Sequence, residues 1–466
     1  PLIRFSLKIR HRAQEVLEKY ISDQNALAII QALLLGDKTD LNADVKQKFG
    51  EAGVMHILAV SGLHVGIIYV LILMLLGQRA TNITRPWLVA LIGLPLLWSY
   101  ALITGLSPSV MRATTMFSFV ILGQAINRKS NIFNTVAMSA FFLLIFDPAM
   151  LFSVGFQLSY LAVTGILLIY PILARKYSPN NWLGFQMMQI IYVSLAAQLA
   201  TLRLSLFYFH QLPTYFLIGN ILAIPLAMLL IWLGLSLIII GSIWSTAGTI
   251  IGFLLDQILV KFTWLLGLIQ QLPYANFQDI QIGRPQVVML YLTLALLIVW
   301  HKTQLKMYFF VACAVIISFF IFNSGLIIER SKQAQIVFYS LRNSWAIDFI
   351  QGNAAFLVQD GSESALAQDY QFIVQPYRRQ TGVTEAIDEG VASRETTLGT
   401  LVNFKDTVVL ITTRVEDATD VPEFVDFILF VSSRDFGRTT KVRFQNRDGG
   451  TEQHILSAQG ALQIEL

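Results

Sequence analysis

Residues 56–75 read HILAVSGLHVGIIYVLILML, and this stretch shows most directly what kind of fold the chain has. Its second half is continuously apolar, as in a helix that crosses a membrane. Its first half carries two histidines, a serine and two glycines, which a helix surrounded by lipid does not need. We therefore expect a membrane helix, beginning near residue 54, whose first turns face a partner helix or a polar path.

The composition of the whole chain agrees with a membrane protein. Of its 466 residues, 55% are hydrophobic and 13% are charged, whereas soluble domains carry about 25% charged residues. Long apolar segments recur, and they predict a polytopic α-helical membrane protein with about 9–10 spans. We place the spans at about residues 54–77, 86–104, 110–126, 133–147, 151–174, 185–206, 214–241, 246–271, 286–300 and 307–323.

Two segments differ from this apolar part. Residues 1–22 are charged and amphipathic, and we expect them to follow a longer N-terminal region that is missing. Residues 332–466 have the composition of a water-soluble domain. Short β-branched and aromatic runs there, DYQFIVQPY at 369–377 among them, predict a small mostly-β fold. This tail holds 12 Lys and Arg against 18 Asp and Glu, so an acidic tail follows a basic membrane part.

The charges of the connections predict an orientation. Cations follow alternate apolar segments, at Arg79, Arg85, Arg128, Lys129, Arg175, Lys176, Lys302 and Lys306. The other connections carry few cations, around Ser107, Asp147, His210 and Asp279. By the positive-inside rule the cation-rich connections lie in the cytoplasm, so the tail is expected outside the cell.

The polar half of the opening stretch has three interpretations. Ser61, Gly62 and Gly66 could form a face that packs on another helix, with His56 and His64 hydrogen-bonded nearby. Alternatively, Ser61 and His64 could be the nucleophile and base of an intramembrane hydrolase. Residues three apart on a helix would meet only with distortion, and no orienting acid is apparent. The third interpretation is a wet groove for a polar solute.

Polar residues in other apolar segments favour the groove. Arg112 lies in the third segment, where a cation needs a carboxylate, a phosphate or water. The remaining positions that are polar or interrupt a helix are Gln157, Ser159, Gln198, Asn220 and Pro225. Each could join two helices, but together they supply hydrogen-bond donors that suit an anionic solute. The apolar segments contain no cluster of Asp or Glu that would indicate a cation pump.

Five blocks of sequence resemble, in the same order, the competence domain of the ComEC family, the inner-membrane channels of bacterial natural transformation. The blocks are QALLLGDKTDL, GVMHILAVSGLHVGII, SPSVMRATTM, FDPAMLFSVGFQLSYLAVTGI and LPTYFLIGNILAIPL. The resemblance implies that single-stranded DNA crosses the cytoplasmic membrane through residues 23–325 while the other strand is degraded outside. All the candidate residues above are then expected to shape the pore or its gate.

The resemblance also implies two partners, a cytoplasmic ATP-dependent helicase or translocase and an external DNA-delivery protein. The tail loosely resembles the opening strands of the metallo-β-lactamase-like domain that many family members carry. However, the chain has no His-x-His-x-Asp-His run. Because a zinc hydrolase holds several ligands together, we expect a degenerate tail with no metal, no cofactor and no nuclease activity. An exporter of another anionic polymer remains an alternative function.

Overall fold

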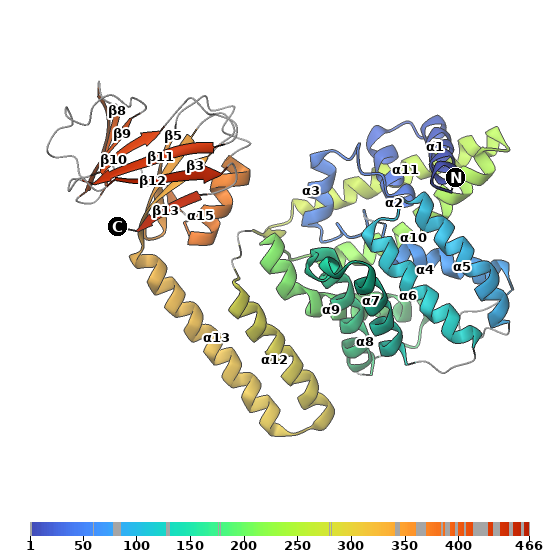
Figure 1. The fold of residues 1–466 in the computed structure, drawn as a ribbon. Coiled ribbons are helices and arrows are strands. Elements are labelled where there is room, and N and C mark those ends of the chain that lie inside the picture. Colours follow the sequence, from blue (N-terminus) through green and yellow to red (C-terminus); the bar gives the residue numbers. More distant parts are fainter. Residues whose placement is uncertain are drawn as a thin grey trace. The chain divides into compact units, whose positions relative to one another are not determined.

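The structure is a computed structural model, and it divides into two compact units, Pro1–Leu305 and Lys306–Leu466. Figure 1 shows the first unit as a bundle of helices and the second as a long helix followed by β-strands. The described residues are 2–58, 60–77, 85–126, 131–175, 177, 179–278, 280, 282–340, 345–359, 370–383, 385–386, 392–396, 399–404, 407–412, 427–431, 439–446, 451–457 and 461–465. Four of the cations used above, Arg79, Arg128, Lys129 and Lys176, lie outside them, as does Asp279.

The first unit is almost entirely helical. Its helices are α1 (Leu2–Tyr20), α2 (Gln24–Leu35), α3 (Ala43–Glu51), α4 (Gly62–Leu75), α5 (Pro86–Ile103), α6 (Pro108–Ala125), α7 (Ile132–Phe146), the short η1 (Pro148–Phe152), α8 (Val154–Ala174), α9 (Trp182–Phe209), α10 (Phe216–Gly241), α11 (Ser245–Gln270) and α12 (Arg284–Thr303). Two short strands, β1 (Leu212–Pro213) and β2 (Asn276–Phe277), pair antiparallel. They tie the segment before α10 to the segment before α12.

Seven described helices are long and apolar enough to cross a membrane, namely α5, α8, α9, α10, α11, α12 and α13 (Lys306–Lys332). This agrees with a polytopic membrane protein, but three of the expected spans differ. Helices α4 and α7 are shorter than the seven, and α6, which carries Arg112 and several hydroxyl side chains, is not among them. The 14 residues of α4 reach only about 21 Å, whereas a bilayer core is about 30 Å thick.

The core of the first unit surrounds α2. Nine of its 12 residues are buried, as expected for a helix that is apolar on all sides. Around it pack Leu17 of α1, Phe49 of α3, Ala227 of α10 and Phe262 of α11. The amphipathic segment at the start of the chain is therefore part of this bundle. A second apolar cluster joins α4, α5 and α6 and holds the opening stretch in place.

The second unit begins with α13 (Lys306–Lys332) and continues into two sheets. One sheet has the strand order β13-β3-β4-β5-β6, and the other β12-β11-β10-β9-β8-β7. Neighbours are antiparallel except for β5 with β6 and β9 with β10. The strands are β3 (Ala334–Ser340), β4 (Trp345–Gln351), β5 (Ala354–Gln359), β6 (Glu385–Ala386), β7 (Ala392–Thr396), β8 (Gly399–Phe404), β9 (Thr407–Thr412), β10 (Phe427–Val431), β11 (Thr439–Asn446), β12 (Thr451–Ser457) and β13 (Ala461–Glu465).

The tail is β-rich as expected, but the strand expected at 369–377 is wrong. A π-helical turn, Tyr370–Val374, leads there into α15 (Gln375–Thr381). The apolar residues that pack on the first sheet are Tyr370, Ile373, Val374 and Tyr377. Their spacing of three, four and seven residues is the period of a helix, and a strand would have turned alternate residues away.

Candidate functional site

Helix α4 does not begin where the sequence suggested. Residues 52–58 form turns, and the helix starts at Gly62 with Ser61 as its N-cap. The Ser61 backbone is extended (φ −121°, ψ 178°), and its hydroxyl accepts a hydrogen bond from the Leu63 amide at 3.3 Å. In return, Nδ1 of His64 accepts the Ser61 amide at 3.1 Å. This reciprocal arrangement is a capping box, with histidine in the place where glutamate is usual.

The same cap brings the Ser61 hydroxyl within 3.1 Å of His64 Nδ1. The expectation that these side chains meet only with distortion is wrong, because Ser61 precedes the helix and does not belong to its first turn. The Nδ1 lone pair is nevertheless already engaged by the Ser61 amide. The other ring nitrogen, Nε2, is buried and has no hydrogen-bond partner in the part of the chain that the structure describes. Neither nitrogen is therefore oriented by an acid.

The glycines of the opening stretch lie against α6. A β-carbon at Gly62 would lie 3.7 Å from Ala113, and one at Gly66 would lie 3.4 Å from the ring of Phe117. Small residues at this spacing let two helix backbones approach closely. The helix-packing interpretation thus describes where Gly62 and Gly66 lie. His56 lies in the turns before the helix, where its side chain is exposed.

The cap is also where the first three sequence blocks meet. Gly36, which ends α2 with a left-handed φ of 71°, faces the Thr104 carbonyl and the side chain of Val60. The Ser109 hydroxyl, at the start of α6, donates to the Val60 carbonyl at 2.6 Å. A left-handed residue with backbone this close is suited to glycine alone. Segments that are far apart in sequence therefore converge just before Ser61.

The block at the start of α10 lies against the same region. Gly53 has a φ of 74°, and a β-carbon there would lie 2.7 Å from the side chain of Phe216. Gly219 lies directly against the Ala52 carbonyl and leaves no room for a side chain. The turns that precede α4 are thus held against the first two turns of α10.

Arg112 joins the remaining block to this region. Arg112 is buried, with only 6% of its surface exposed. Its guanidinium nitrogens lie 3.5 and 3.7 Å from the position a β-carbon would take at Gly155, in the first turn of α8. Among the described residues it has no hydrogen-bond or ion-pair partner, and its Nε is buried and unpaired. A buried cation without an acid is costly inside a membrane bundle.

The other polar candidates lie on the helices in different ways. Gln157 joins segments, because its amide donates to the Leu151 carbonyl at 2.9 Å and accepts from the Tyr208 hydroxyl at 3.1 Å. Ser159 and Gln198 are half-buried and make no side-chain hydrogen bond with a described residue. Gln157 is therefore the candidate with a defined helix-joining contact.

Two candidates lie on α10. Asn220 is buried, and its Oδ1 has no hydrogen-bond partner among described residues. Pro225 lies inside the continuous helix with its side chain exposed. The proline does not break α10 into two helices, and it faces outward from the packed side.

Sequence reasoning missed a second arginine within the helical bundle. Arg203 of α9 donates to the Leu199 carbonyl one turn earlier and stands over the Tyr291 ring at 5.6 Å from its centroid. The Tyr291 hydroxyl in turn donates to the Ala200 carbonyl at 3.0 Å. A search for arginine inside apolar segments would have found Arg203 together with Arg112. Both arginines keep a buried Nε without a hydrogen-bond partner among the described residues, and each lies close enough to a tyrosine to interact with it, Tyr160 for Arg112 and Tyr291 for Arg203. They differ in that Arg203 also donates to a backbone carbonyl and lies over an aromatic ring.

Outside the apolar helices, Asp37 fastens the first helix to the block that follows α2. Its carboxylate lies 3.1 Å from Arg10 and accepts from Gln14 at 3.0 Å. Hydrogen bonds from the Thr39 hydroxyl and amide, with the charge of Arg10, lower the pKa of Asp37 against the opposing effect of burial. Asp37 thus holds α1 beside the convergence of blocks.

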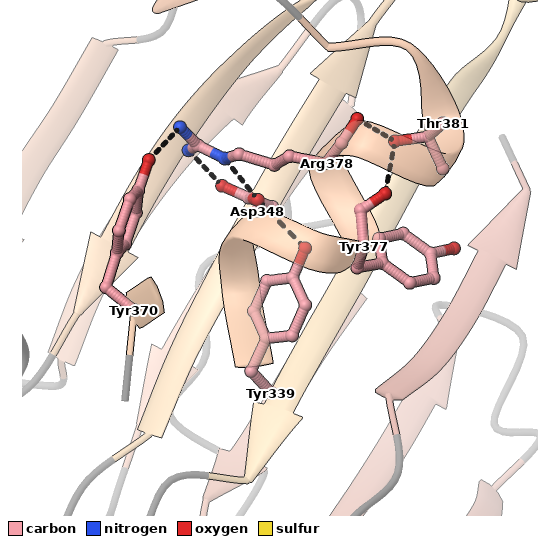
Figure 2. A network of polar contacts seen from close by, with 6 residues as sticks. All are labelled: Tyr339, Asp348, Tyr370, Tyr377, Arg378 and Thr381. Atoms are coloured by element: carbon pink, nitrogen blue, oxygen red, sulfur yellow. Dashed lines mark hydrogen bonds and ion pairs between the residues drawn. The ribbon is translucent and has the colours of Figure 1, made fainter. Parts of the chain in front are cut away.

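The tail has a buried polar network of its own, which Figure 2 shows. Asp348 of β4 is fully buried and is held by two bonds from the Arg378 guanidinium, one of them 2.7 Å long. Tyr339 donates to the same carboxylate at 3.0 Å, and Arg378 donates to Tyr370 at 3.1 Å. Burial, and then the charge of Asp348, raise the pKa of Tyr339. This network fastens α15 to the first sheet.

No group of three or more His, Cys, Asp or Glu residues suited to a metal is found among the described residues. Asp348, which is fully buried, is neutralised by Arg378 and is not free to bind a cation. From the sequence, Asp348, Asp360 and Asp426 are expected in turns or at the surface. This is wrong for Asp348, which is fully buried on β4, and Asp360 and Asp426 lie outside the described residues.

Comparison with known proteins gives a consistent result for the first unit. A family model described as "Competence protein" matches residues 33–304. ComE operon protein 3 of Bacillus subtilis is 29% identical over 269 residues, which are 58% of this chain and 33% of the relative. Recombination protein 2 of Haemophilus influenzae is 24% identical over 231 residues, 47% and 29% of the two chains. The uncharacterized protein YcaI of Escherichia coli is 24% identical over 252 residues, 51% and 32% of the two chains.

The matched segment is thus about a third of the length of each of these curated relatives. No solved structure matches the chain. The likeness to a metallo-β-lactamase domain, expected for the tail, has no counterpart in the comparisons, since the family match ends at residue 304.

Proposed function

This chain belongs to the competence protein family, and from that premise we propose that it forms a route for single-stranded DNA across the cytoplasmic membrane of a bacterium during natural transformation. The seven long apolar helices suit a multi-pass membrane protein. The proposed route runs through the first unit, where the five sequence blocks converge.

One observation carries this proposal. Among the described residues of the first unit, the buried polar side chains include Arg112, His64, Asn220 and several hydroxyls, and none is Asp or Glu. Arg112, His64 and Asn220 each keep a buried atom without a hydrogen-bond partner. Polar groups at membrane depth usually face a cavity or a partner. An interior with a cation and hydrogen-bonding groups but no acid suits a polyanion better than a cation.

The position of the convergence supports an entrance. Ser109 and Gly155 lie at the first turns of α6 and α8, next to the connections around Ser107 and Asp147, which carry few cations. The Ser109 hydroxyl donates to the Val60 carbonyl, so the cap of α4 lies at the same end of these helices. By the positive-inside rule such connections lie outside the cell. In this proposal the DNA strand enters at the cap of α4, and the acidic tail lies on the outer side as well.

The force that moves the strand comes, in this proposal, from a partner. The sequence has neither a P-loop nor a GxGxxG motif, so ATP would be used by a separate cytoplasmic translocase. An external DNA-binding protein would deliver the strand to the outer end.

The test is uptake of labelled DNA in cells that carry the intact gene or its deletion, with surface-bound and nuclease-protected DNA scored separately. We expect the deletion to leave DNA bound at the surface and to abolish the protected fraction. Normal protection in the deletion strain would refute the proposal, and export of another anionic polymer would then become the better explanation.

The 3.1 Å contact between the Ser61 hydroxyl and His64 favours one second candidate, an intramembrane serine hydrolase. A fluorophosphonate probe labels an activated serine. Labelling of the wild-type protein that is lost in Ser61→Ala would support the hydrolase, and absence of labelling in both would exclude it. We expect no labelling, because the Ser61 amide already occupies the ring nitrogen that would act as the base.

A further inference from the structure

The surroundings of Arg112 place two positive groups against each other. The first is the buried guanidinium, which has no ion-pair partner among the described residues. The second is the N-terminus of α8, a helix of 21 residues, whose first amides carry a partial positive charge. The Ser153 hydroxyl accepts only the Phe156 amide at 3.3 Å. The amides of Val154 and Gly155, which precede Phe156 in the first turn, have no hydrogen-bond partner within the helix and none among described side chains.

Gly155, which has no side chain, lets the guanidinium lie close to the first turn of α8. The three atoms nearest to a β-carbon built there all belong to the Arg112 guanidinium, at 3.5, 3.7 and 3.9 Å. A buried arginine that points at a helix N-terminus is unfavourable unless an anion lies between them. Arg203 shows the alternative, since its charge is met by a backbone carbonyl and the Tyr291 ring.

We propose that Arg112 and the first-turn amides of α8 bind one phosphodiester group of the passing DNA strand. The assignment of the phosphate to DNA rests on the proposed function. The binding chemistry itself does not, because guanidinium and helix amides bind any phosphate oxygen. A lipid headgroup carries the same group, so the experiment must separate these two sources.

The experiment measures binding of a fluorescent single-stranded oligonucleotide to the full chain in lipid nanodiscs, over a series of salt concentrations. Arg112→Gln is expected to weaken binding about tenfold, which corresponds to about one charge-assisted hydrogen bond. It should also reduce the slope of log K against log salt by about 0.7, the value for one phosphate on a single strand. Arg203→Gln is the matched control, and it should leave the slope unchanged.

Gly155→Ala separates anion binding from a structural role of Arg112. The added methyl meets the guanidinium at ordinary contact distance, and alanine favours a helix more than glycine does. A structural arginine would therefore tolerate the change, whereas a methyl group beside the guanidinium would obstruct a phosphate bound there. We expect weaker binding with normal membrane levels. Wild-type affinity and slope in both Arg112→Gln and Gly155→Ala would overturn the site.

Two further arms identify the source of the phosphate. With an uncharged methylphosphonate oligonucleotide, the wild-type protein and Arg112→Gln should bind equally. The difference between them for ordinary DNA should persist in both zwitterionic and anionic lipid, and its loss in anionic lipid would assign the site to a headgroup. If the proposed function itself failed, even the wild-type protein would not bind DNA, or the deletion strain would take up DNA normally. Failure of the site alone would leave wild-type binding intact.

Discussion

The cap of α4 makes a quantitative prediction about Ser61. Replacement by alanine removes the acceptor of the Leu63 amide, while the bond from the residue 61 amide to His64 remains. Loss of a serine N-cap costs about 1 kcal/mol, a factor of about five in the equilibrium that starts the helix. Ser61→Asn keeps a side-chain oxygen in the cap. We therefore expect near-normal DNA uptake for Ser61→Asn and at most about a fivefold loss for Ser61→Ala.

The assay is the amount of nuclease-protected DNA per cell, normalised to the amount of the variant in the membrane. Ser242→Ala is a suitable control, because that exposed hydroxyl only donates to the Ile238 carbonyl in its own helix. A reacting serine behaves differently, since removal of a nucleophile lowers a rate by several orders of magnitude. Losses of that size in both Ser61→Asn and Ser61→Ala, at normal membrane levels, would refute the capping role.

Three further predictions concern the tail and the first helix. Arg378→Leu leaves the buried Asp348 without its ion-pair partner and should destabilise the tail by about 3–5 kcal/mol. The measurement is urea-dependent proteolysis of the full chain, and wild-type resistance would contradict this prediction. The raised pKa of Tyr339 means that the folded tail holds the proton of the Tyr339 hydroxyl more tightly than the unfolded tail does. The stability of the tail should therefore fall as the pH rises above about 10. Tyr339→Phe should remove this dependence of stability on pH. The lowered pKa of Asp37 predicts that the stability contributed by this carboxylate is complete above the ordinary aspartate pKa of about 3.9 and is lost as the pH falls through the lowered value. On acidification, Asp37→Asn should unfold at the same pH as the wild-type protein or at a higher pH, and should not show the loss of stability that protonation of Asp37 causes.

We also propose that the tail does not cut DNA. The purified full chain should leave single- and double-stranded DNA intact with or without a chelator, checked by gel electrophoresis. Degradation that a chelator abolishes would show that metal ligands are assembled without a His-x-His-x-Asp-His run.

The sequence alone was sufficient for the features that depend on short-range pattern. Apolar length and low charge predict a membrane protein, and the change in composition near residue 332 predicts a separate β-rich tail. The order of the five blocks predicts the family. These features can be predicted without a structure, because hydrophobicity and turn chemistry act within about twenty residues of chain.

Tertiary structure decided how the individual polar residues are used. Ser61 and His64 could be placed on one helix from their spacing, but in the structure Ser61 precedes that helix. The helix starts at Gly62 with a capping box between Ser61 and His64, and the turns before it are held against α6 and α10. Likewise, Arg112 and Arg203 look alike in the sequence, as two arginines within apolar segments. Whether such a charge is satisfied depends on groups that distant segments bring within a few ångströms, and no local pattern of residues contains that information.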